Sequence, residues 1–384
     1  MLRIRGRETR PLVQGGMGIG ISAHRLAGAV AREGCVGTIS SVDLRRLHPD
    51  LILATGRSRD RQAIESANLV ALDREIRAAR EIAGGEGMIA VNVMRAVSQY
   101  PDCVRQACKS GADAIVVGAG LPFDLPELTA DYPEVALIPI LSEARAIGLV
   151  LKKWQRKGRL PDAIVIEHPR YAGGHLGASK LEEVGDARFD FAQVLPAARQ
   201  LFEALDIAPI PLIVAGGINS PERVRDAFAL GAAAVQVGTP FAVAEEGDAH
   251  PNFKRVLAGA RAEDIVTFMS VAGLPARAVR TPWLAGYLEK EEALQRRAKR
   301  RRACTLGWDC LAQCGLRDGR PGMGQFCIDH HLAAALRGDT DRGLFFRGSE
   351  PVPFGAAIRP VRELAGYLLQ DSAKRTALGA GSPP

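Results

Sequence analysis

Two glycine-containing turns follow short apolar runs in the second half of the chain. One is Ala215-Gly216-Gly217-Ile218, and the other, about 20 residues later, is Gly238-Thr239. Glycine lets backbone N–H groups approach a ligand closely, and the Thr239 hydroxyl adds a further hydrogen-bonding group. In β/α barrels, the loops after the seventh and eighth strands often bind phosphate in this way. The two turns therefore predict a phosphate site.

A third glycine-rich junction, Gln14-Gly15-Gly16-Met17-Gly18-Ile19-Gly20, lies near the N-terminus between a short apolar run and a helix-like segment. Its glycine spacing differs from the Rossmann fingerprint, and no acidic residue ends the next expected strand. We expect its backbone to lie against a ligand, but not against a dinucleotide held in the Rossmann manner.

His175 follows two glycines, Gly173 and Gly174, in a loop after an expected strand. Histidine has an ordinary pKa of about 6.5, which suits proton transfer near neutral pH, and the glycines let its loop approach a ligand. The competing interpretation is a structural or surface histidine. We predict a proton-transfer role, because the loop lies at the expected active face.

Four cysteines gather late in the chain with the spacing Cys304-x5-Cys310-x3-Cys314-x12-Cys327. Thiolates are ligands of iron–sulfur clusters and of zinc. Three interpretations remain open at this point: a [4Fe–4S] cluster, a zinc ion, or cysteines that bind no metal.

The elements that position these residues follow a strand–helix rhythm up to about residue 245, which is typical of repeated βα units with a parallel sheet. An open doubly wound sheet would show the same alternation, but eight apolar strands favour a closed β/α barrel whose wall is covered by helices. The expected strands are Pro11–Val13, Val36–Ser40, Met88–Val91, Ala114–Val117, Val135–Ile140, Ala163–Ile166, Leu212–Val214 and Ala234–Val237.

Two regions interrupt this rhythm. The segment from Val42 to Ser66 is polar and contains Pro49 and Gly56, so it is predicted to be a long loop over the active face. From Pro251 onward the strand pattern stops. We therefore expect a barrel over residues 1–250 and a helical extension with the cysteines over residues 251–384, packed on the barrel.

Composition limits the class of protein. The chain is 47% hydrophobic and 24% charged, which is ordinary for a globular protein. Its net charge of +7 is partly local to Arg296–Arg302, and no nucleic-acid recognition motif accompanies that run. No apolar run approaches the length of a membrane span, and no apolar stretch follows the charged N-terminus, so we expect a cytoplasmic protein without membrane or nucleic-acid partners.

The glycine loops, together with Ala172-Gly173-Gly174-His175-Leu176-Gly177 and Gly273-Leu274-Pro275-Ala276-Arg277, resemble the nitronate monooxygenase (2-nitropropane dioxygenase) family. Its relatives include flavin-dependent enoyl-ACP reductases and NAD(P)H:quinone reductases. The resemblance covers roughly residues 10 to 285 and implies an FMN-binding TIM barrel. The cysteine spacing separately resembles the [4Fe–4S] segment of the dienoyl-CoA reductase and trimethylamine dehydrogenase group.

The family resemblance implies a set of cofactor contacts and a base or proton donor, His175. The residues implied to contact FMN are Gln14, Gly15, Gly16, Met17, Asn92, Gly118, Ser142, Gly174, Gly216, Gly217, Gln236, Gly238 and Thr239.

The chain departs from the family just before His175, where the usual Gln-Gly and acidic residue are replaced by Glu167-His168-Pro169-Arg170-Tyr171. Arg170 and Tyr171 are therefore candidate substrate contacts, with surface charge and loop packing as the alternative. The resemblance implies oxidation of a small nitronate by dioxygen. An NAD(P)H-dependent quinone or enoyl-thioester reductase is the alternative, and a flavin-based sensor or electron-transfer protein is a third interpretation.

Overall fold

Eight parallel strands close into a barrel in the computed structural model, which describes residues 1–301, 304 and 306–370. Arg302 of the basic run and the Gly/Pro-rich end of the chain lie outside the described residues. The predicted strands are confirmed, with small shifts at their ends. They are β3 (Leu12–Gln14), β4 (Val36–Ser40), β5 (Met88–Met94), β6 (Ala114–Gly118), β7 (Ala136–Leu141), β8 (Ile164–Glu167), β10 (Leu212–Ala215) and β11 (Ala234–Val237).

The barrel interior is an apolar core formed by alternate strand residues, such as Val13, Val116 and Val165. An N-terminal hairpin of β1 (Leu2–Ile4) and β2 (Arg7–Thr9) adds Leu2 and Ile4 to the same core. Because these two side chains pack with residues at the beginnings of the strands, the hairpin plugs the end of the barrel opposite the expected active face.

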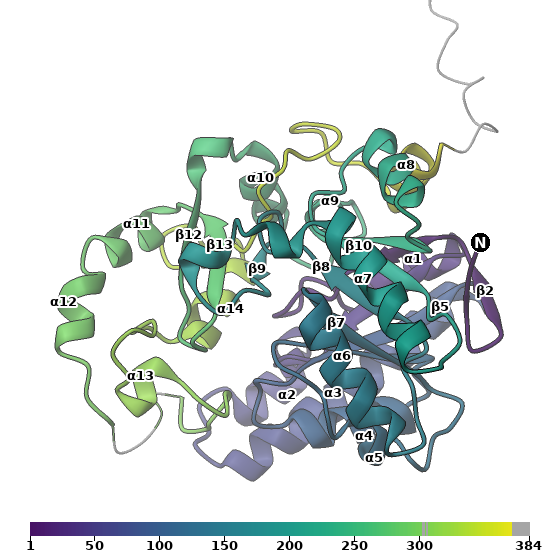
Figure 1. Ribbon diagram of the computed structural model, residues 1–384. Coiled ribbons are helices and arrows are strands. Elements are labelled where there is room, and N and C mark those ends of the chain that lie inside the picture. The colour runs from purple at the N-terminus through teal and green to yellow at the C-terminus, as the bar shows by residue number, and fades with distance from the viewer. Residues whose placement is uncertain (302–303, 305, 371–384) are drawn as a thin grey trace, which may run out of the picture.

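Helices surround the barrel, as Figure 1 shows. A short α9 (Thr239–Ala242) follows the last strand, and the outer position between α8 and α1 is occupied by α15 (Val361–Leu369), which contacts both. The extension therefore completes the ring of helices. The preceding helices are α1 (His24–Arg32), α3 (Arg61–Ala83), α4 (Tyr100–Lys109), α5 (Leu125–Leu128), α6 (Ala144–Gln155), α7 (Phe191–Ala204) and α8 (Pro221–Ala229).

The predicted long loop between Val42 and Ser66 is wrong for most of its length. A 3-10 turn at Leu44–Leu47 and helix α2 (Pro49–Thr55) fill it, and α3 begins at Arg61. Pro49 occupies the first turn of α2, where its fixed φ and missing N–H are tolerated, so it starts a helix rather than breaking one.

The extension is not purely helical, which corrects the sequence prediction. Strands β12 (Ile265–Met269) and β13 (Pro275–Val279) form a hairpin, and β13 also pairs with β9 (Gly174–His175), a short strand in the loop after β8. Each strand is only five residues long or less, so its pattern is weak in the sequence. The helices of this region are α10 (Pro251–Gly259), α11 (Pro282–Leu288), α12 (Glu291–Arg296), α13 (Gly315–Asp318) and α14 (Ile328–Leu336).

A buried ion-pair network fastens the extension to the barrel. Arg46 bonds to the carboxylates of Asp43, in the loop after β4, and Asp329, on α14. The side chains of Asp43 and Asp329 are 0% and 3% exposed. Arg45 also approaches Asp43, at 2.8 Å. Because the two carboxylates are buried, their charges need the neighbouring guanidinium groups to compensate them.

None of the helices within the described ranges combines the length and apolar character that crossing a membrane requires.

Candidate functional site

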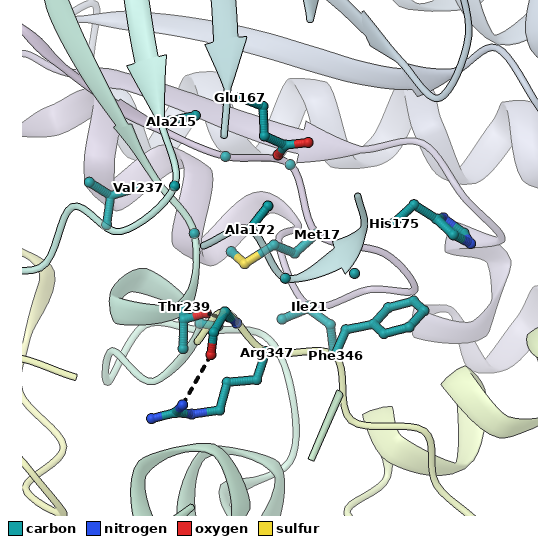
Figure 2. Close-up of a pocket in the computed structure, with 18 of the residues that line it drawn as sticks. Met17, Ile21, Glu167, Ala172, His175, Ala215, Val237, Thr239, Phe346 and Arg347 are labelled. Carbon is teal, nitrogen blue, oxygen red and sulfur yellow. Dashed lines mark hydrogen bonds between the residues drawn. The ribbon is translucent and has the colours of Figure 1, made fainter. Parts of the chain in front are cut away.

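A cavity of about 260 Å³ opens at the carboxyl ends of the barrel strands, between the barrel and the extension. Figure 2 shows Glu167 at one side of it, Thr239 and Arg347 at the other, and His175 beside Phe346. The structure brings most of the predicted site residues into its wall: Gly15, Gly16, Met17, Asn92, Gly118, Tyr171, Gly174, His175, Gly216, Gly217, Gln236, Gly238 and Thr239.

Three predicted site residues lie outside this wall. Gln14 is fully buried, and its amide oxygen accepts a 2.8 Å hydrogen bond from the Thr38 N–H of the neighbouring strand. Ser142 lies against Gly177. Arg170 points away from the cavity and donates to the carbonyl of Gly185. These three side chains contact other parts of the protein instead of the cavity.

The predicted phosphate loops meet a segment that sequence reasoning did not assign. The Gly348 N–H donates to the Thr239 hydroxyl over 3.0 Å, which brings the C-terminal segment against the loop after β11. Gly217 has a φ of +77°, and a Cβ there would lie 3.0 Å from the Tyr171 ring. Glycine is thus required for the close approach of these two loops.

Arg347 is the only lysine or arginine among the described residues of the cavity wall. Its guanidinium is buried and donates to the carbonyls of Leu257 and Gly348 over 2.9 and 3.0 Å. These bonds hold a positive charge next to the glycine loops. The clue in the sequence was the apolar run Leu344-Phe345-Phe346 between glycines, but nothing in it indicated a contact with the barrel.

His175 is positioned by the extension rather than by the barrel alone. β9 pairs with β13, so His175 lies opposite Ala276. The His175 Nε2 atom lies 2.8 Å from the hydroxyl of Ser270, which also accepts the Ala272 N–H. The Phe346 ring lies 5.6 Å from the imidazole. These contacts fix the orientation of the imidazole.

Burial lowers the pKa of His175 to about 4, so its imidazole is neutral at physiological pH. A ring that donates its Nε2 proton to Ser270 keeps a lone pair on Nδ1, which bonds to no group within the described part of the chain. That tautomer leaves Nδ1 able to accept a proton. The sequence alone suggested the ordinary pKa of about 6.5, and the lower value in the structure results from burial of the side chain.

Hydrogen bonds made by Arg277 and His168, outside the cavity wall, hold the loop between β8 and His175. The buried guanidinium of Arg277, on β13, donates to the carbonyls of Pro169 and Ala172, the first of these over 3.0 Å. His168 is buried outside the cavity and bonds to Asp190 over 3.0 Å. The residues that depart from the family pattern thus mostly build the loop, and Glu167 and Tyr171 are those that reach the cavity.

The four cysteines of the extension form no disulfide. Cys310 and Cys314 pack into an apolar cluster with Phe326, and burial raises the pKa of both thiols. Within the described residues, no group of three or more His, Cys, Asp or Glu side chains could hold a metal ion. The metal site predicted at Cys304, Cys310, Cys314 and Cys327 is therefore not supported by their arrangement.

The cavity fits the cofactor that the resemblance implies. Its glycine loops, the Thr239 hydroxyl and the charge of Arg347 suit a phosphate, and the amides of Asn92 and Gln236 suit the polar edge of a flavin ring. A Cβ on Gly16 would lie 2.3 Å from the Cβ of Asn92, so only glycine lets the loop after β3 pass beside that amide. These residues would hold FMN.

Comparisons with known proteins agree with this interpretation. A family profile of nitronate monooxygenases matches residues 7–371. A probable nitronate monooxygenase of Bacillus subtilis is 27% identical over 288 residues, which is 72% of this chain and 78% of that protein. A nitronate monooxygenase of Pseudomonas aeruginosa is 35% identical over 118 residues, about 30% of each chain (30% and 31%).

Solved structures show the same fold. FabK from Thermotoga maritima has a TM-score of 0.65 at 23% identity, covering 94% of this chain and 91% of that one. The nitroalkane oxidase from Streptomyces ansochromogenes has a TM-score of 0.61 at 19% identity, covering 94% and 96%. With the profile match spanning nearly the whole sequence, the chain belongs to the nitronate monooxygenase family of FMN-dependent TIM-barrel oxidoreductases.

Proposed function

We propose that this enzyme oxidises small alkyl nitronates with dioxygen, and that it also accepts the parent nitroalkanes after His175 removes a proton from the carbon beside the nitro group. The observation that carries the proposal is the neutral, enclosed imidazole of His175 at the cavity that fits FMN. At physiological pH the imidazole is in its neutral form, which is the form that a proton acceptor requires.

The apolar part of the cavity wall suits a small substrate that carries an alkyl group. Apolar side chains from both the barrel and the extension line it: Val42, Met94, Ile140, Leu332, Leu344 and Phe346. Phe346 lies next to His175 and would pack against the alkyl chain. Apolar walls also exclude water, which strengthens electrostatic interactions at the reacting atoms.

When bound, FMN supplies the redox chemistry, accepting electrons from the substrate and passing them to dioxygen. The protein contributes placement and proton transfer. Ser270 holds the His175 ring, β13 holds its backbone, and the phosphate loops would hold the cofactor.

The reductase alternative requires His175 to donate a proton to the product instead of accepting one from the substrate. The alternative is tested by the same experiment as the proposal.

Mixing the FMN-loaded protein anaerobically with propyl-2-nitronate is expected to bleach the flavin absorbance rapidly, and admitting air should restore it. NADH and NADPH should bleach it slowly or not at all. Stopped-flow absorbance measures all three reactions. Rapid bleaching by a nicotinamide with none by the nitronate would replace the proposed oxidase activity with the reductase.

The phosphate loop can be tested separately. Gly217→Ala forces a left-handed conformation on alanine, at a cost of about 1–2 kcal/mol, and places a methyl group 3.0 Å from Tyr171. We expect FMN affinity, measured by quenching of flavin fluorescence, to fall about 5- to 30-fold as the loop shifts. Gly158→Ala is the matched control, because Gly158 has a φ of +68° with open space around it. Equal affinities for both variants would remove Gly217 from the cofactor site.

A further inference from the structure

Glu167 is a cavity-lining side chain for which the proposed reaction has no role. It ends β8, where Val165 faces the barrel interior and Ile166 the surrounding helices. The alternation turns Glu167 back toward the barrel axis, at the level of its register partner Ala215 and of Gln236 beyond it. Figure 2 shows its carboxyl extending from the strand into the cavity.

The carboxyl of Glu167 forms no hydrogen bond or ion pair with any residue that the structure describes, and burial raises its pKa to about 7. Two other enclosed carboxylates, Glu75 and Asp43, are paired with basic side chains. Glu75 contacts His24 and His48 at 2.7 and 3.0 Å, and Asp43 contacts Arg45 and Arg46. An unpartnered carboxyl in an enclosed site is costly, which indicates that its partner is the ligand of the cavity.

The other titratable or charged side chains that face the cavity are Tyr171, His175, Arg347 and Glu350. None of them bonds to Glu167 within the described residues. The neighbouring strands β7 and β10 contribute Ile140 and Ala215, which carry no charge. His175 does not change its protonation near pH 7, since its pKa is about 4. The carboxyl of Glu167 is thus well placed to take up a proton from solvent near neutral pH.

We propose that Glu167 binds a proton when FMN in this cavity is reduced and releases it when the flavin is reoxidised. The inference rests on the FMN site described above. Reduction consumes two electrons, supplied by a nitronate or another reductant, and one proton to give the anionic reduced flavin. The added negative charge disfavours a second negative charge beside it, so the Glu167 carboxylate takes one further proton from solvent and becomes a neutral acid.

This proton uptake has a measurable consequence. Around pH 7 the midpoint potential of the bound flavin should fall with pH more steeply than flavin chemistry alone requires, by up to about 30 mV per pH unit for one extra proton per two electrons. Glu167→Gln keeps the shape of the side chain but cannot bind the proton. Its potential should lose this additional slope and lie above that of the wild type at high pH, where the carboxylate is ionised.

The experiment is a redox titration of the FMN-loaded wild type and variants from about pH 5 to about pH 9, spanning the ordinary and raised carboxyl pKa range. The xanthine oxidase system supplies electrons in the presence of an indicator dye. Glu350→Gln, which removes another carboxyl from the same cavity wall, should keep the wild-type slope. Equal slopes in the wild type and Glu167→Gln would overturn the proposal, as would weaker FMN binding by Glu167→Gln without a change of slope, because the carboxyl would then serve only to bind FMN.

The wild type alone also tests the idea. If the midpoint potential of the wild type changes with pH only as flavin chemistry alone requires, the proposal is overturned, even if the Glu167→Gln variant fails to fold. Because the electrons come from xanthine oxidase, the outcome does not depend on whether the enzyme oxidises nitronates, and a failure of the proposed function would be seen separately in the bleaching experiment.

Discussion

Replacing His175 with asparagine is expected to slow flavin reduction by a neutral nitroalkane about 10²- to 10⁴-fold, the usual contribution of a general base. Asparagine keeps a polar side chain of smaller size, but it cannot accept a proton as the imidazole does. Reduction by the pre-formed nitronate should slow far less, since its proton is already gone. Anaerobic stopped-flow with a nitroalkane and its nitronate measures both rates in the same variant.

The pH dependence separates this role from a purely structural one. The imidazole accepts a proton only in its neutral form, which is present above its pKa of about 4 and is lost as the pH falls through that value. The wild-type rate with the nitroalkane should therefore decline at acidic pH, and the same decline should be absent from His175→Asn.

His331 provides a matched control, because burial also lowers its pKa to about 4, but it stacks on Trp283 outside the cavity wall. His331→Asn should keep the nitroalkane rate of the wild type. Equal losses with nitroalkane and nitronate in His175→Asn would show that His175 has another role.

Replacing Arg46 with methionine is expected to lower the free energy of unfolding by about 3–5 kcal/mol, the usual cost of removing one partner from a buried ion pair. The substitution leaves the Asp43 and Asp329 carboxylates enclosed without their shared guanidinium. Because Asp329 lies on α14, whose Leu332 and Ala335 line the cavity, FMN affinity should fall as well. Urea denaturation and an FMN titration measure the two effects.

An exposed pair provides the comparison for Arg46. Arg74 and Asp50 form an ion pair in which the side chains are 43% and 60% exposed, so Arg74→Met should cost less than about 1 kcal/mol. Adding Asp329→Asn to Arg46→Met should recover part of the lost stability, because it removes the carboxylate that has lost its guanidinium, whereas Asp43 still contacts Arg45 at 2.8 Å. Similar costs for Arg46→Met and Arg74→Met would contradict the inferred network.

The barrel was predictable from the sequence because its strands are local, apolar and regularly spaced. Runs such as Val36–Ser40 and Ala234–Val237 are buried on both sides in the structure, as their composition indicated. The glycine turns at Gly216-Gly217 and Gly238 were predictable for a similar reason, since glycine directly after a strand is typical of a tight turn or of a backbone that passes close to a ligand. Helix α2 was missed because Pro49 was interpreted as a break instead of a start.

The residues that complete the site were not predictable from local patterns. Ser270 is 95 positions from His175 in the sequence, and Gly348 is 109 positions from Thr239, yet both pairs share hydrogen bonds. Arg170 carried a charge suited to an anion, but its loop turns the side chain outward to Gly185. The cysteine spacing was typical of a metal site, but packing against Phe326 gave two of these thiols an apolar setting.

The sequence by itself determined the barrel and a phosphate site at the carboxyl ends of its strands, because repeating strands and glycine turns are local properties of the chain. The family resemblance of its motifs implied FMN. Only the tertiary structure decided how His175 is held, how far its pKa falls and which charges face the cavity. Those properties depend on burial and on contacts with β13 and the 343–351 segment, which bring together residues far apart in the sequence.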